Sequence, residues 1–115
     1  MPRDRRAYLW DVLESIRLIE EFTRGKSLEQ YSSDPMLRSA VERQLEIVGE
    51  AVAQGVRHFP QLAGQITNCE QIVAFRNRLI HGYSVVSDAV VWGVIQSDLP
   101  VLKREAEDLT RSTRE

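Results

Sequence analysis

Apolar residues recur at steps of three and four along most of the chain, and this spacing is typical of amphipathic helices rather than strands. Gly25 follows the first apolar stripe at the position that a helix C-cap prefers, so we expect the first helix to end there. Ser27 and Gln30 then have the spacing of a capping box, which predicts a short helical turn. The first stripe consists of Leu9, Val12, Leu13, Ile16, Ile19 and Phe22.

The middle of the chain contains start signals for two further helices. Asp34 and Pro35 predict one start, because Asp caps free backbone N–H groups and Pro is tolerated at the first helical position. The apolar stripe that follows runs to about Gly55, and residues 58–67 are predicted to form a connector. Asn68 is expected to cap the next helix. The apolar residues of that helix are Ile72, Phe75, Leu79 and Ile80.

Gly82 is a stop signal for that helix, and the last helix is predicted to open at Ser87 or Asp88. Pro100 lies inside the last helix, where it removes a backbone donor and clashes with the preceding turn. We therefore expect a kink or a restart near residues 97–98.

The helical pattern predicts the fold class. No stretch alternates between apolar and polar residues for long enough to predict a strand. Four main helices with short links indicate an all-α fold, an antiparallel four-to-five-helix up-and-down bundle. We expect one domain over residues 1–115, with a polar tail after about residue 110.

The charge balance limits how the chain can recognise a partner. The formal net charge is −2 and the pI is about 5.7, so no global field favours nucleic acid. Thirteen of the fifteen basic residues are arginine. Any contact with RNA must therefore be local, through forked guanidinium groups that suit phosphate and carboxylate.

Cysteine content and apolar runs exclude several protein classes. Cys69 is the single cysteine and the chain has two histidines without carboxylates at ligand spacing, so we expect neither a disulfide framework nor a metal site. Residues 1–6 are charged, and the longest apolar run, residues 89–95, is too short to cross a bilayer. We expect a cytoplasmic protein with no membrane segment and no cofactor.

One segment, residues 75–83, concentrates candidate chemistry. On a helix Asn77 and His81 lie one turn apart on the same face. Arg76 and His81 are five positions apart, which turns them about 140° from each other at 3.6 residues per turn. They converge only if Arg76 extends along the surface or if a neighbouring chain completes the site. The polar members of the segment are Arg76, Asn77, Arg78, His81 and Tyr83.

The same residues have structural interpretations. Arg76 and Arg78 could be solvated charges, and His81 could cap the helix C-terminus, where the dipole favours a cation. Asn77 could orient His81 or a phosphate, or could be a polar residue on an exposed face. Tyr83 could be a half-buried tyrosine at the edge of the bundle.

Two acidic residues and the second histidine leave further alternatives. Glu46 and Glu50 share a helical face and could pair with arginines such as Arg76 and Arg43, or could support the site from behind. His58 is interpreted as structural or exposed.

Three motifs resemble one family. The pattern Arg-Asn-x-x-x-His-x-Tyr at 76–83 resembles the Arg-x4-His-x-Tyr motif of the HepT-like branch of the HEPN superfamily. Leu-Glu-Ile-Val-Gly-Glu-Ala at 45–51 resembles the Leu-Glu-x-x-Gly-Glu-Ala helix of that family. Val-Trp at 91–92, followed by Asp-Leu-Pro-x-Leu at 98–102, is the third match. The resemblance extends over about residues 8–104.

The resemblance implies a function. HepT-like proteins are small helical toxins encoded beside a minimal nucleotidyltransferase (MNT). For this chain it implies a HEPN-like fold and a metal-independent endoribonuclease toxin of a type VII-like toxin–antitoxin system. Arg76 would bind the phosphate, His81 would transfer protons and Asn77 would support them. Tyr83 would be the residue to which the MNT-type antitoxin attaches AMP.

The residue types allow this chemistry. The ribose 2′-OH can attack the adjacent phosphate if a base accepts its proton, and histidine titrates nearest to neutrality. A guanidinium can stabilise the charge that gathers on the phosphate oxygens. DNA lacks the 2′-OH, so the same site should leave it intact.

The fold alone does not decide between two classes of function. The rival is a non-enzymatic helical subunit that binds the nucleotidyltransferase and is modified by it. Because one chain supplies a single motif histidine, and cleavage benefits from both a base and an acid, we expect an enzyme to be a two-fold homodimer with its motifs facing each other. The expected interface comprises the helices carrying residues 69–82 and 88–99.

Overall fold

The computed structural model describes residues 3–81 and 86–113, which form helices and no strand, so the all-α prediction is confirmed for this part of the chain. No helix within those ranges is long and apolar enough to cross a membrane. The elements in chain order are α1 (Arg5–Thr23), α2 (Leu28–Ser32), α3 (Pro35–His58), α4 (Leu62–Gln65), α5 (Cys69–His81), α6 (Asp88–Gly93), the π-helical turn η1 (Val94–Asp98) and α7 (Leu99–Thr113).

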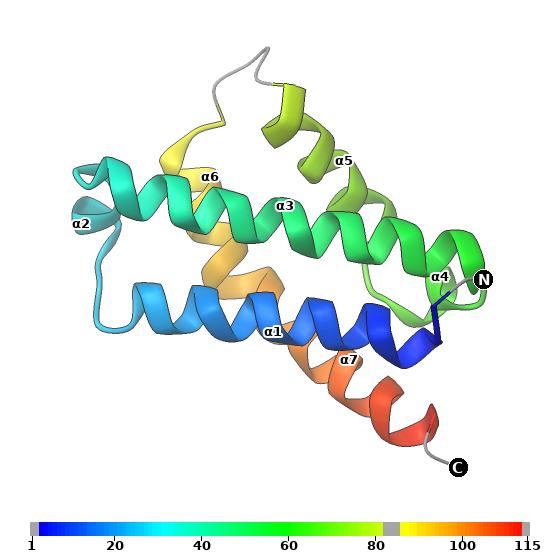
Figure 1. Cartoon of the computed structure of the whole chain (residues 1–115). Helices are drawn as coiled ribbons and strands as arrows, with labels where there is room; N and C mark the ends of the chain where they lie inside the picture. Colours follow the sequence, from blue (N-terminus) through cyan, green and yellow to red (C-terminus); the bar gives the residue numbers. More distant parts are fainter. Residues whose placement is uncertain (1–2, 82–85, 114–115) are drawn as a thin grey trace.

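Helices α1 and α3 form the centre of the fold. They run antiparallel side by side, and α6, η1 and α7 form a continuous helical segment that crosses behind them (Figure 1). Ile16 and Ile19 of α1 and Val41 of α3 are fully buried between these elements. Helix α5 packs on α3 at one end and rises away from the bundle toward its last turn (Figure 1).

Most of the predicted helix starts are confirmed, because each has a side-chain cap. Ser27 and Gln30 form both hydrogen bonds of a capping box at α2. The carboxylate of Asp34 accepts a hydrogen bond from Leu37 N at 3.1 Å, with Pro35 at the first position of α3. These caps satisfy backbone donors that would otherwise lack partners.

Three boundary predictions are corrected. Helix α3 continues past Gly55 to His58, because Gly55 is buried and packs closely on Leu62 and Tyr8 instead of ending the helix. The connector contains the short helix α4. Asn68 precedes α5 but has φ of 56°, in the left-handed region, rather than the extended conformation of an N-cap. The stop signal at Gly82 lies outside the described residues.

The predicted irregularity before Pro100 is confirmed as a π-helical turn. Residues 94–98 form η1 between α6 and α7, so the helical direction continues through the proline. Proline cannot donate to the carbonyl of the preceding turn and its ring crowds that carbonyl, and a wider turn relieves the conflict. Ile95 within this turn and Leu99 directly after it are buried, and they keep the segment packed on the core.

The short helix α2 is held by a buried aromatic contact. Tyr31 is fully buried, and its ring lies 5.5 Å from that of the half-buried Trp92 of α6. Burial raises the pKa of the Tyr31 hydroxyl, so the group stays neutral. Trp10 of α1, by contrast, is 62% exposed in the single chain.

Candidate active site at the end of helix α5

Helix α5 separates the predicted site residues onto two faces. Asn77, Arg78 and His81 are exposed to solvent, whereas Arg76 is half-buried on the side that packs on α3. The helix is regular through His81, so the five-residue step directs Arg76 and His81 about 140° apart. A single chain therefore brings Asn77 and His81 to one face and does not bring Arg76 to the same face.

The Arg76 side chain packs against α3 at a point where the two helices approach closely. Its Cβ and Cγ atoms cover the Cα of Gly49, and a Cβ added at Gly49 would lie only 2.6 Å from Arg76 Cγ. Real Cβ atoms essentially never lie so close to another heavy atom. Glycine at position 49 is therefore what lets the base of the Arg76 side chain rest on α3.

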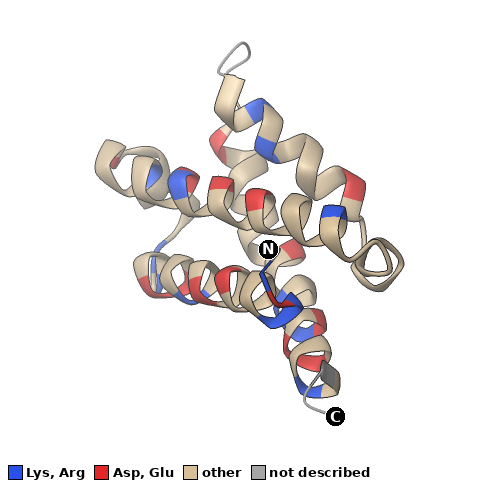
Figure 2. Cartoon of the chain, turned by 45° about the vertical axis from the view of Figure 1, so that its right-hand side comes forward, with Lys and Arg blue, Asp and Glu red and all other residues tan. Residues whose placement is uncertain are grey.

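The arginine that reaches α3 is paired with a carboxylate there. Nη1 of Arg76 donates to Oε2 of Glu50 in an ion pair between α5 and α3. Glu46, one turn earlier, pairs instead with Arg43 of its own helix at 3.3 Å. Figure 2 shows the acidic positions of α3 beneath the basic positions of α5. Of the alternatives open for these two glutamates, the structure assigns Arg76 to Glu50 and Arg43 to Glu46.

His81 is the last described residue of α5. The final turn of the helix stands clear of the α1–α3 layer (Figure 1), and the His81 side chain is exposed. Tyr83, the predicted modification site, lies outside the described residues. Among the described residues, His81 therefore lies at an exposed helix end rather than in an enclosed pocket.

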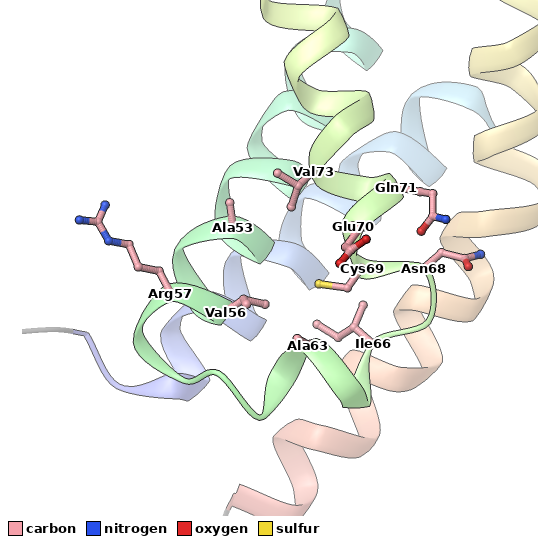
Figure 3. A pocket seen from close by; sticks show the side chains of 10 residues that line it. All are labelled: Ala53, Val56, Arg57, Ala63, Ile66, Asn68, Cys69, Glu70, Gln71 and Val73. Atoms are coloured by element: carbon pink, nitrogen blue, oxygen red, sulfur yellow. The ribbon is translucent and has the colours of Figure 1, made fainter.

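A pocket elsewhere on the surface contains none of the predicted site residues. It has a volume of about 660 Å³ and lies between the end of α3, α4 and the beginning of α5 (Figure 3). Cys69 lines this pocket, and burial raises the pKa of its thiol, so it is a poor nucleophile. Within the described part of the chain no three His, Cys, Asp or Glu side chains cluster as a metal site would require.

Comparison with known proteins identifies the family. The family model described as Ribonuclease HepT-like matches residues 12–109. The chain belongs to the HepT-like ribonuclease family. The match covers α3 and α5, and thus both sides of the Gly49–Arg76 contact.

Curated relatives agree with this assignment. A probable ribonuclease HepT of Thermococcus cleftensis is 38% identical over 96% of this chain and the whole of the relative. A putative RNase of Methanocaldococcus jannaschii is 34% identical over 91% of this chain and 95% of the relative. A putative RNase of Caldanaerobacter subterraneus is 29% identical, with 95% and 96% covered. No solved structure gives a significant match.

The contact between α3 and α5 can be tested in this HepT-like chain at Gly49. Gly49→Ala should lower the free energy of unfolding by about 1–3 kcal/mol, the usual cost of overpacking, because the new methyl group overlaps the base of Arg76. The measurement is urea unfolding followed by circular dichroism.

Gly93→Ala is the matched control, since a Cβ there meets nothing within 4 Å. In a helix this change should be neutral or should stabilise by up to about 1 kcal/mol. Equal unfolding free energies for the two variants would contradict the close approach.

Proposed function

We propose that this HepT-like chain is a metal-independent endoribonuclease and the toxin of a type VII-like toxin–antitoxin system. The observation that carries the proposal is the end of α5, where α3 fixes Arg76 while His81 and Asn77 remain exposed. The names of the relatives as ribonucleases support the reaction class. The net charge of −2 favours a local site over a general RNA-binding surface.

The reaction follows from the chemistry of RNA and of these side chains. Neutral His81 accepts the proton of the ribose 2′-OH, whose oxygen attacks the adjacent phosphorus. The bond from phosphorus to the 5′ oxygen breaks, and a protonated histidine returns a proton to that oxygen. Arg76 stabilises the charge on the phosphate oxygens. The products are a 2′,3′-cyclic phosphate and a 5′-hydroxyl end, with no metal or cofactor required.

A homodimer would supply what one chain lacks. In a single chain Arg76 and His81 are directed to different faces, and only one motif histidine is present. Two apolar side chains on these helices are also weakly covered in the single chain: Ile80 of α5 is 52% exposed, and Val90 of α6 is 45% exposed. A two-fold interface through α5 and α6 would cover these side chains and bring two motifs into one cleft.

The dimer can be tested by charge substitution at the proposed interface. Ile80→Glu and Val90→Glu should convert a 26 kDa particle, twice the 13.2 kDa chain, into a monomer and lower RNA cleavage. Light scattering measures the mass. Met36→Glu is the matched control, because Met36 is an 82% exposed apolar residue of α3. A wild-type monomer with full activity would refute the dimer.

The catalytic assignment is tested with purified protein and a single-stranded RNA in EDTA. His81→Ala and Arg76→Ala should each lower the cleavage rate by about 100-fold or more, as for loss of a general base or of an oxyanion contact. His58→Ala and Arg57→Ala are matched controls at exposed positions of α3, and should cut as fast as wild type. A DNA of the same sequence should stay intact.

The stability of the two site variants should differ. His81 is exposed, so its truncation should leave the melting temperature unchanged, whereas Arg76 packs on Gly49 and its loss should lower it. Unimpaired cleavage by folded His81→Ala protein would show the catalytic assignment to be wrong. RNA left intact by wild-type protein, with binding to a nucleotidyltransferase, would favour the non-enzymatic rival.

Neutralisation by AMP is the second part of the proposal. Tyr83 follows His81 by two positions in the sequence. Its phenolic oxygen would attack the α-phosphorus of ATP on the MNT-type antitoxin, and pyrophosphate would leave. The attached AMP adds a negative phosphodiester and a bulky base beside the motif, which would occupy the phosphate-binding group and repel RNA.

Co-expression with the cognate nucleotidyltransferase tests this step. Intact-mass spectra should show added AMP units, peptide spectra should place the adduct on Tyr83, and the modified protein should no longer cut RNA. Tyr83→Phe should escape modification and keep much of its cleavage activity. An adduct on another residue would contradict the site, and a fully modified protein that still cleaves RNA would contradict the control mechanism.

A further inference from the structure

We propose that Glu50 is a positioning residue that holds the Arg76 guanidinium for catalysis. This inference rests on the proposed function, because it assigns a partner to the arginine of that site. The geometry carries it: the ion pair joins the middle of α3 to α5, and no residue of α5 itself takes that role. The Arg76 side chain is 17% exposed and that of Glu50 is 49% exposed.

The Glu50 carboxylate is itself oriented. Its Oε1 accepts a hydrogen bond from Gln54 Nε2 at 3.0 Å, while Oε2 accepts from Arg76. The two oxygens therefore have different partners, and the carboxylate plane is fixed from both sides. Gln54 lies one turn further along α3, so the whole support belongs to one rigid helix.

The guanidinium is restrained at both of its ends. At its base, the aliphatic stem rests on Gly49, so the side chain leaves α5 in one direction. At its tip, Nη1 is taken by Glu50, and Nε is buried without a hydrogen-bond partner among the described residues. Nη2 is the remaining nitrogen, and it makes no hydrogen bond within the described part of the chain. Nη2 is therefore the guanidinium nitrogen that is left for a substrate phosphate.

A carboxylate next to a phosphate-binding arginine could instead act as a competitor. It would then reduce the affinity for RNA, and its removal would lower KM or raise the rate. A positioning role predicts the opposite result. The arginine would still meet the phosphate but with a misplaced guanidinium, so the loss should appear in kcat, because the charge is greatest in the transition state.

The test is a double-mutant cycle on RNA cleavage. Glu50→Ala should lower kcat by about 10- to 100-fold, with KM changed by less than about 3-fold, since small misplacements of a catalytic group cost this much. Glu50→Gln keeps the shape and one acceptor oxygen and should fall between Glu50→Ala and wild type. In an Arg76→Lys background, Glu50→Ala should lower kcat by less than about 3-fold, because lysine has no planar guanidinium for Glu50 to position.

Glu46→Ala is the matched control: Glu46 lies one turn away on the same helix and pairs with Arg43. Its kcat should equal that of wild type. An unchanged kcat for Glu50→Ala, an equal loss in the Arg76→Lys background, or a lowered KM would each overturn the positioning role. If wild-type protein leaves RNA intact, the proposed function fails, and if Arg76→Ala cuts RNA at the wild-type rate, the catalytic role of Arg76 fails. Either failure is distinguished from a failure of the positioning role, which would appear only in the Glu50 variants.

Discussion

The close approach of α5 to α3 at Gly49 is the contact on which the candidate site depends. A side chain at position 49 would meet the base of Arg76, so the helices could not keep their present separation. The same approach brings the Arg76 guanidinium to Glu50. The packing of α5 on α3 and the position of the Arg76 guanidinium therefore depend on the same contact.

The rest of α5 is held less firmly than its beginning. Cys69 is its buried residue, whereas Ile72, Val73, Phe75 and Leu79 are partly buried against the core. Helix α5 is thus fixed on α3 at Arg76, while the His81 side chain at its end is exposed in the single chain. The core of the bundle is buried without the end of α5, so that end can stay exposed while the rest of the fold is packed. In the single chain, Arg76 and His81 accordingly lie on different faces.

Local sequence signals predicted most of the fold. Asp34 caps α3 through a hydrogen bond to the first turn of that helix, and Pro100 disturbs the preceding turn through its own ring. Both effects are local, so the sequence alone predicts them. Gly55 was misinterpreted as a helix end, because its role in packing on α1 and α4 depends on tertiary contacts. The partnership of Glu50 with Arg76, across 26 positions, likewise depends on helix packing. The sequence offers Arg76 and Arg43 as partners of Glu46 and Glu50, and only the packing of the helices assigns each pair.

The charges around the candidate site favour recognition of RNA through specific contacts rather than through overall electrostatic attraction. Glu50 pairs with Arg76 and Glu46 pairs with Arg43, and the chain as a whole has a formal net charge of −2. Little net charge is left to hold nucleic acid non-specifically, so binding by counterion release is weak. If the proposed function holds, discrimination would come from the few groups that contact the scissile phosphate and the adjacent 2′-OH. In the proposed ribonuclease, a phosphate attached near Arg76 would compete with RNA for the guanidinium, so the modification proposed at Tyr83 would act on the same few groups.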